Sequence, residues 1–213
     1  MPNAVIASIA KKKDFKIIKA RKEDIHVLKN VLVKSFMNDP FTNWLVKHDD
    51  KILSRMDAIF APVLNHFGFK YAHVYTTEEK NCCAVWIPPG KYNPNSIFNL
   101  LLLPAWIKVV GWSRLLKTMQ AASVLSNHHA GPQYFYLSTV GTLPELQGKG
   151  IGSAILKPVL DICDGDKIPA CLETSNEKNI SFYEKHGFKI KSEFIIPHGG
   201  ARTWVMTREP INS

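Results

Sequence analysis

The stretch Leu-Ser-Thr-Val-Gly-Thr-Leu-Pro-Glu-Leu-Gln-Gly-Lys-Gly-Ile-Gly-Ser, residues 137–153, joins three patterns in one short segment. An apolar, β-branched run over Tyr134–Thr142 predicts a buried strand. The chain then turns at Pro144, and the apolar periodicity from Ala154 to Ile162 predicts a helix. The stretch therefore indicates a strand, a glycine-rich turn and a helix.

The turn Gln147–Gly152 has the chemistry of an anion site. Three glycines in five residues leave no Cβ between a ligand and the backbone, and they permit positive φ angles. The first amides of the next helix lack intrahelical partners, and the helix dipole adds partial positive charge. A phosphate or pyrophosphate suits such a cradle. The spacing matches neither the dinucleotide fingerprint nor a Walker A loop, and taken alone it also suits a tight turn without a ligand.

A second motif lies about thirty residues further on, over Leu172–Phe188. It consists of a buried strand, an Asn and a helix that ends Phe-Tyr-Glu-Lys-His-Gly-Phe. Q-x-x-G-x-G after a strand, followed by this second motif, resembles the GNAT superfamily of acyl-CoA-dependent N-acyltransferases. Within it, residues 134–153, 172–188 and 202–210 are similar to the puromycin N-acetyltransferases, whereas the first half of the chain is only loosely similar.

The rest of the chain predicts alternating helices and strands. The strands are expected over Phe15–Ala20, Tyr71–Thr76, Cys82–Pro88, Ala170–Ser175, Phe188–Pro197 and Thr203–Arg208. The helices are expected from Arg21 to Phe36, around Trp44, over Ile52–Phe67, over Asn95–Asn127 with a break near Gly111, and over Asn176–His186. This order predicts an α/β fold. The resemblance implies the GNAT fold, a mixed central β-sheet of six to seven strands flanked by helices, in which splayed strands form the acyl-CoA cleft.

Length and composition favour a single globular domain over residues 1–213, with residues 1–13 as a flexible basic lead-in and residues 134–210 as the cofactor-binding half. The net charge of +9 suits an anionic partner. Because Lys and Arg are scattered and no nucleic-acid motif accompanies them, we expect no nucleic-acid partner; the phosphates of a CoA ester match the charge equally well.

Four cysteines without a C-x-x-C pair indicate unpaired, partly buried thiols in a reducing compartment, and no metal site. The apolar stretch Ile97–Trp112 is interrupted and too short to span a bilayer. The short apolar run Ala4–Ala10 precedes its positive charges, which is the wrong order for a secretory signal. We therefore expect a cytoplasmic protein without a membrane partner, either a monomer or a weak homodimer.

The resemblance also implies a set of residues that contact acetyl-CoA. Backbone groups of Val140, Gly141 and Thr142 pair with the pantetheine arm like an added strand. The pyrophosphate lies on the turn and the helix start, formed by Gln147, Gly148, Lys149, Gly150, Ile151, Gly152 and Ser153. Asn176 and Asn179 occupy cofactor-contacting positions, although Asn also suits helix caps and turns.

The same resemblance places Tyr183 as the general acid, and an unperturbed tyrosine pKa of about 10 keeps it protonated. Glu173, in an otherwise apolar strand, is the candidate base, because burial raises the pKa of a carboxyl; it also suits an ion pair with a neighbouring strand. The pair His128-His129, expected in an exposed loop, is the rival base.

The acceptor site is expected at Phe36, Asp39, Phe41 and Trp44, where Asp39 suits either a cationic amine or a helix terminus. The sequence therefore predicts an acetyl-CoA-dependent N-acetyltransferase that acts by direct attack on the primary amine of a small molecule, such as a puromycin-like antibiotic or toxin. Acetylation of a protein or peptide amine, and an acyl-CoA-binding sensor without turnover, are the alternatives.

Overall fold

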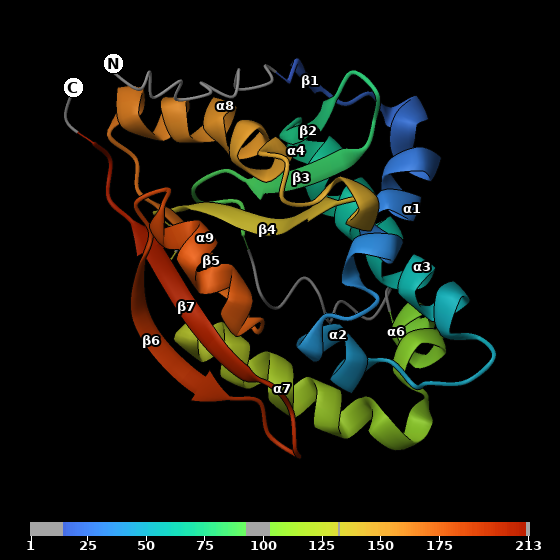
Figure 1. Ribbon diagram of the computed structural model, residues 1–213. Helices are drawn as coiled ribbons and strands as arrows, with labels where there is room; N and C mark the ends of the chain where they lie inside the picture. The colour runs from blue at the N-terminus through green and yellow to red at the C-terminus, as the bar shows by residue number, and fades with distance from the viewer. Residues whose placement is uncertain (1–14, 93–102, 132, 212–213) are drawn as a thin grey trace, which may run out of the picture.

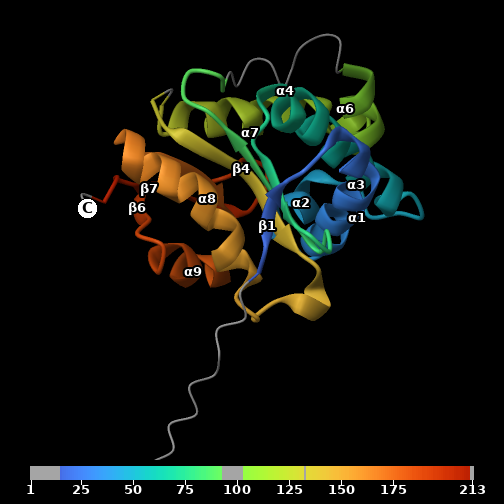
Figure 2. The ribbon, with the colours of Figure 1, turned by 90° about the horizontal axis from the view of Figure 1, so that it is seen from above.

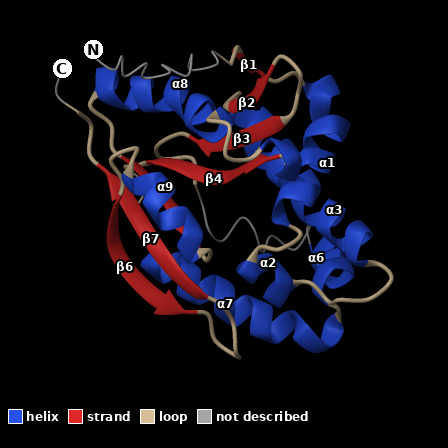
Figure 3. Cartoon of the chain, in the orientation of Figure 1, coloured by secondary structure: helices blue, strands red, loops and turns tan. Residues whose placement is uncertain are grey.

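The chain forms an α/β fold in a computed structural model that describes residues 15–92, 103–131 and 133–211 (Figure 1). The lead-in expected over residues 1–13, and residues 95–102 of the helical stretch expected over 95–127, lie outside the described residues. A seven-stranded sheet in the order β1-β2-β3-β4-β5-β7-β6 is the centre of the molecule (Figure 3). The predicted mixed sheet of six to seven strands is therefore confirmed.

The strands are β1 (Ile17–Lys19), β2 (Val74–Thr77), β3 (Cys82–Ile87), β4 (Phe135–Thr142), β5 (Ala170–Thr174), β6 (Lys189–Ile195) and β7 (Arg202–Arg208). Neighbouring strands are antiparallel except β4 and β5, which are parallel. A parallel pair needs a crossover connection, and here that connection is the helix that follows the glycine-rich turn.

The longer helices are α1 (Ile25–Phe36), α3 (Ile52–Pro62), α6 (Leu103–Val110), α7 (Leu115–His128) and α8 (Ile151–Asp166). Shorter ones are α2 (Pro40–Leu45), α4 (Phe69–Tyr71) and α9 (Ile180–Glu184). Figure 2 shows α8 and α9 on one face of the sheet and α1, α2 and α3 on the other. Each face therefore has its own apolar core.

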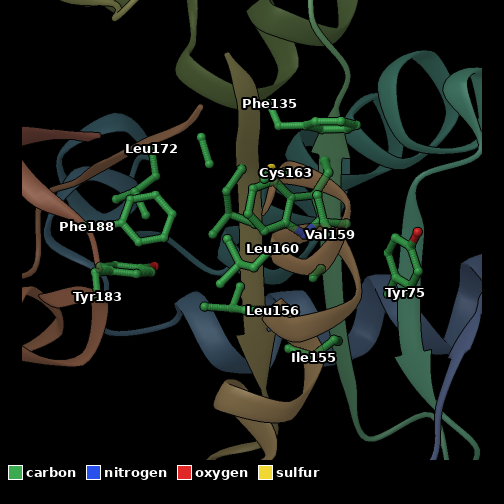
Figure 4. Packing of buried hydrophobic residues seen from close by; sticks show 14 of the residues in the cluster. Tyr75, Phe135, Ile155, Leu156, Val159, Leu160, Cys163, Leu172, Tyr183 and Phe188 are labelled. Carbon is green, nitrogen blue, oxygen red and sulfur yellow. The ribbon is translucent and has the colours of Figure 1, made fainter. Parts of the chain in front are cut away.

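Successive residues along a strand point alternately into one core and into the other. Cys82 packs with α8 residues such as Val159, and Cys83 packs with α1 and α3, so these adjacent thiols point to opposite faces as the strand period predicts. Figure 4 shows the first core, in which Leu156 and Leu160 of α8 lie over the sheet. All four cysteines are free and buried.

Several predicted ends are wrong by a few residues, each for a local reason. The helix predicted over Ile52–Phe67 ends as an α-helix at Pro62, which has no N–H to continue the ladder, and a π-helical stretch follows over Val63–Gly68. The strand predicted over Tyr71–Thr76 begins only at Val74, because Ala72 adopts a left-handed conformation with φ 57°.

The helix predicted over Asn176–His186 splits into a 3₁₀ turn over Glu177–Asn179 and the short α9. Gly187, with φ 86°, follows α9 as predicted. The break predicted near Gly111 is confirmed, since this glycine has φ 77° between α6 and α7.

Candidate active site

Strands β4 and β5 separate beyond their first three residue pairs. The pairs are Phe135–Ala170, Tyr136–Cys171 and Leu137–Leu172, whereas β4 continues to Thr142. The divergence of these strands opens the middle of the sheet (Figure 1). A β-bulge begins the separation, because Val85 and Trp86 of β3 face Thr139 and Leu137, which leaves Ser138 without an opposite residue.

The register of β4 decides which backbone groups face this opening. The Leu143 N–H donates to Asn81 O (3.0 Å), and hydrogen-bonded pairs alternate along an antiparallel ladder. The groups of Gly141 therefore face β3, whereas those of Val140 and Thr142 face the opening. The Thr142 carbonyl already accepts from Ser35 Oγ (2.9 Å) and from Gln147 Nε2 (3.1 Å).

The glycine-rich turn has the geometry that its sequence predicts. Gly148 and Gly150 have φ angles of 74° and 88°, and a Cβ on Gly148 would meet no atom within 4 Å. Gly150 is the N-cap of α8 and brings no side-chain cap, so no side chain caps the first amides of α8. The structure thus has an exposed cradle that fits a pyrophosphate.

The remaining residues of this motif have different surroundings. Ile151 is buried in the core, and a Cβ on Gly152 would lie 3.2 Å from Phe182, so these two residues pack α8 against α9. Lys149 Nζ donates to the Glu145 carbonyl (3.0 Å), which closes the turn. Ser153 lies in the first turn of α8.

The two asparagines of the second motif also differ in their surroundings. Asn176 Oδ1 accepts from the Lys178 N–H (3.2 Å), a turn-stabilising contact. Asn179 precedes α9 without making a side-chain cap. This residue lines a cavity beside β4 and β5.

A cavity of about 310 Å³ lies where the separated strands meet α1, α2, α3 and α7. It brings together residues from distant parts of the sequence: Phe36, Asp39, Phe41 and Trp44 from the predicted acceptor region, with Val140, Glu173, Asn179 and Tyr183. The residues of the glycine-rich turn are absent from its described lining, and they lie at the start of α8.

Tyr183 is a buried phenol at the wall of this cavity, 7% exposed. Burial, and then the negative charge of Asp39, raise its pKa well above 10, so the hydroxyl keeps its proton at neutral and alkaline pH. Such a group serves as a proton donor rather than as a base.

Asp39 caps a helix, as predicted, and it also faces the cavity. Its Oδ1 accepts from the Thr42 N–H (2.8 Å) as the N-cap of α2, and it also lines the cavity. Burial raises the pKa of this carboxyl, against the lowering effect of its hydrogen bonds to the start of α2.

Glu173 faces the cavity from β5 and accepts a hydrogen bond at Oε1 from His129 Nδ1 (2.8 Å). The two side chains are 10% and 8% exposed. The expectation of an exposed loop histidine is therefore wrong for His129, because its ring packs against Tyr92 and Tyr136 and contacts Glu173. Glu173 thus has a polar partner at the end of α7, rather than the ion pair with a neighbouring strand that the sequence also suggested, and it lines the cavity as well.

Two tyrosines complete the surroundings of this pair. The Tyr92 ring lies 4.2 Å from the His129 ring and 4.7 Å from the Tyr136 ring, measured between centroids. Burial, with the charge of Glu173, raises the pKa of both phenols, so both stay protonated. Sequence reasoning missed Tyr92 and Tyr136, which belong to no motif and converge with Glu173 only through the strand order.

The lining has a distinct charge pattern. Of its described residues none is Lys, Arg or His, and the carboxylates Glu173 and Asp39 stand among aromatic and aliphatic side chains. The described ranges contain no group of three or more His, Cys, Asp or Glu placed to hold a metal ion, and no helix long and apolar enough to cross a membrane.

Known proteins share both the sequence pattern and the arrangement. Residues 63–188, more than half of the chain, match the family model of the Acetyltransferase (GNAT) family. An uncharacterized N-acetyltransferase of Schizosaccharomyces pombe is 24% identical over 197 residues, which cover 84% of this chain and 77% of that protein. N-alpha-acetyltransferase 50 of Danio rerio is 40% identical over 68 residues, which cover 30% of this chain and 40% of that protein.

The fold also has solved counterparts. The crystal structure of a Corynebacterium glutamicum protein, histone acetyltransferase HPA2 and related acetyltransferase, matches with a TM-score of 0.65 and 20% identity over 93% of this chain and 98% of that chain. At this identity the likeness concerns the fold alone. Together with the family match, the separated strands and the two motifs, it leads to one conclusion: the chain belongs to the acetyltransferase (GNAT) family and is an N-acetyltransferase of that type.

Proposed function

We propose that the protein transfers the acetyl group of acetyl-CoA directly to the primary amine of a small, largely apolar molecule that carries a positive charge. The observation that carries this proposal is the charge of the single cavity that contains Tyr183 and Glu173. Its described lining has carboxylates and aromatic rings but no cation, in a chain whose net charge is +9.

Two features support acetyl-CoA as the cosubstrate, which supplies an activated thioester and is used by the family to which the chain belongs. The open backbone groups of Val140 and the N–H of Thr142 face the gap between β4 and β5, where an extended pantetheine arm can pair as a strand does. The amides at the start of α8, beyond Gly148 and Gly150, suit the pyrophosphate.

The reaction assigns one role to each group in the cavity. Glu173 accepts a proton from the acceptor ammonium, which leaves a neutral amine as the nucleophile. The Val140 or Thr142 N–H stabilises the oxyanion that forms when the C–N bond is made. As the C–S bond breaks, its electron pair goes to the sulfur and Tyr183 donates its proton there, so the product leaves as the CoA thiol; the proton lost from the new amide nitrogen then returns to the Tyr183 phenolate.

A small molecule fits better than a peptide because the cavity is closed on the side of the β6–β7 turn. Trp44 Nε1 donates to the His198 carbonyl (3.3 Å), and the His198 ring contacts Gln120 of α7. These contacts tie α2, α7 and the turn together over the cavity. The relative named N-alpha-acetyltransferase 50 keeps a peptide amine as the second candidate, over the 30% of the chain that it matches.

The experiment is a comparison of acceptors that differ by one carboxylate. Tryptamine against tryptophan, and tyramine against tyrosine, are assayed for thiol release from acetyl-CoA, beside puromycin and short peptides. We expect kcat/KM to favour each amine over its amino acid by about tenfold or more, because an unpaired carboxylate in this lining costs about 1.4 kcal/mol or more. Preference for the amino acids or the peptides contradicts the proposed acceptor class.

A further inference from the structure

We propose that His129 is a positioning residue for Glu173: it holds one carboxylate oxygen so that the other accepts the proton of the acceptor ammonium. This inference rests on the proposed function and deepens it. It assigns a role to the last residue before the loop that leads from α7 to β4, outside both sequence motifs.

The His129 ring lies on the side of Glu173 that faces away from the cavity. His129 Nδ1 donates to Glu173 Oε1 (2.8 Å), and Glu173 lines the cavity whereas His129 is absent from its described lining. His129 therefore lies behind the carboxylate as seen from the acceptor. It acts through Glu173 and does not compete with it as a base.

The His129 ring packs against two tyrosines, and its backbone is held at the end of α7. Its plane lies beside Tyr92, with 4.2 Å between centroids, and meets Tyr136 edge-on at 4.7 Å and 87°. The backbone N–H of His129 donates to the Leu125 carbonyl (3.0 Å) as the C-cap of α7. A ring held in this way fixes the Glu173 rotamer, which is the property that second-layer hydrogen bonds give to reacting groups.

The second ring nitrogen identifies the donor atom. His129 Nε2 is buried and has no partner among the described residues. When the ring is neutral, its one N–H therefore belongs on Nδ1, because an N–H on Nε2 is a buried donor without an acceptor. Oε1 of Glu173 thus receives this hydrogen bond, the Tyr136 hydroxyl donates a second one to the same carboxylate, and its remaining lone pairs are left for the acceptor.

The neighbouring histidine provides a matched control. His128 Nδ1 donates to the Val124 carbonyl (2.9 Å), and its ring stacks on Phe194 at 4.3 Å. It occupies the last position of α7 and has no contact with Glu173 in the described structure. Loss of a histidine at this end of α7 is therefore separable from loss of the contact to Glu173.

The test compares His129→Leu, His129→Asn and His128→Leu for kcat, for both KM values and for thermal unfolding. Asn places an amide N–H close to the position of Nδ1, so His129→Asn keeps the donor. We expect His129→Leu to lower kcat at least tenfold with the KM of acetyl-CoA unchanged, His129→Asn to recover most of it, and His128→Leu to stay within twofold of wild type. Equal kcat in folded His129→Leu and wild type overturns the inference, as does equal loss in folded His129→Leu and His129→Asn.

A second readout is independent of turnover. Two-bond ¹H–¹⁵N spectra of the protein labelled at histidine nitrogen, in alkaline buffer, report which ring nitrogen carries the proton. We expect the Nδ1–H form for His129 in wild type and its loss in Glu173→Leu; an Nε2–H form in wild type overturns the inference. Absence of acetyl transfer by wild type to every amine overturns the proposed function instead, and the catalytic part of this inference with it.

Discussion

The chemistry of Tyr183 follows from where its hydroxyl is buried. The same phenol on the surface has a pKa near 10 and loses its proton in alkaline buffer. In the cavity, burial and the nearby Asp39 charge favour the neutral form. The Tyr183 hydroxyl thus stays protonated, and able to donate its proton, over the whole pH range of an assay.

Tyr183→Phe therefore lowers kcat by about 10²–10⁴-fold, the usual contribution of one general acid, while the retained ring keeps its packing against Phe182 and Phe188. The wild-type pH profile of kcat shows no alkaline limb from Tyr183, because its pKa is raised. Steady-state kinetics across pH measure both effects. An alkaline limb in wild type that disappears in Tyr183→Phe contradicts this account.

Gly141 is required for packing rather than for backbone freedom. A Cβ at this position would lie 2.7 Å from Ser35 Cβ and 2.8 Å from Ser35 Oγ, so α1 approaches β4 only because the side chain is missing. We expect Gly141→Ala to lower the free energy of unfolding by about 1–3 kcal/mol, the usual effect of overpacking.

Gly165→Ala is the control for this substitution. Gly165 lies in α8, and an added Cβ meets nothing within 4 Å, so alanine there raises stability by about 0.5–1 kcal/mol. Urea denaturation of both variants measures the difference. A neutral Gly141→Ala shows that α1 moves freely and that this packing argument is wrong.

At the level of elements, an exposed loop before α3 is linked to α3 and, through Arg55, to α6. Asp49 accepts from Arg55 Nη2 (2.9 Å) and from the Lys51 N–H (3.0 Å), and Arg55 Nη1 donates to the Lys108 carbonyl of α6 (2.6 Å). The loop, α3 and the end of α6 therefore share one ion pair. The arginine beside it, against a smaller opposing effect of burial, lowers the pKa of Asp49 to about 2.

The sign of the resulting pH dependence follows from linkage. The unfolded pKa of Asp is about 3.9, above the folded value, so Asp49 stabilises the fold above about pH 4 and its contribution is lost as pH falls toward 2. We expect Asp49→Asn to lower the urea midpoint at neutral pH and to leave it unchanged at low pH. The same decrease at both pH values contradicts the assignment.

The sequence predicts elements well where a local pattern has both a start and an end. Residues 137–153 contain the end of β4, the turn and the start of α8, so their structure follows from local rules. Ile52–Phe67 keeps an apolar period across Pro62, and only the proline indicates that the α-helix stops. The close approach of Phe182 in α9 to Gly152 in α8 is likewise contained in no local pattern.

The candidate site was predictable in its motif residues and not in the rest. Tyr183 and Glu173 belong to a recognisable motif, and Phe36 and Asp39 close a predicted helix. Tyr92 and His129 meet Glu173 only because β4 lies between β3 and β5 in the sheet. Long-range convergence of this kind leaves no periodicity or spacing in the chain.

At the scale of the whole molecule, the two ends of the proposed site have opposite electrostatics. The chain has a net charge of +9, and no side chain caps the start of α8, whereas the cavity lining has carboxylates and no described cation. Under the proposed function, a polyanionic cosubstrate and a cationic acceptor are thereby attracted to different places. This division permits both to be bound at once, as direct transfer requires.

Salt then affects the two substrates differently. We expect the KM of acetyl-CoA to rise as sodium chloride is added, because the attraction of its phosphates to an exposed positive surface is screened. The KM of an aromatic amine changes less, since its contacts are apolar and buried. Initial rates over a salt series measure both constants. A KM of acetyl-CoA that does not respond to salt contradicts the electrostatic part of the account.

The most direct measurement of the central claim is the stoichiometry of thiol released and acetylated amine formed, for wild type, Glu173→Gln and Tyr183→Phe. The account predicts that wild type releases thiol only when an amine is present, with one acetylated amine for each thiol. It also predicts that both variants bind acetyl-CoA normally and release thiol at least tenfold more slowly. Thiol release without an amine, or tight acetyl-CoA binding without transfer to any amine, contradicts it.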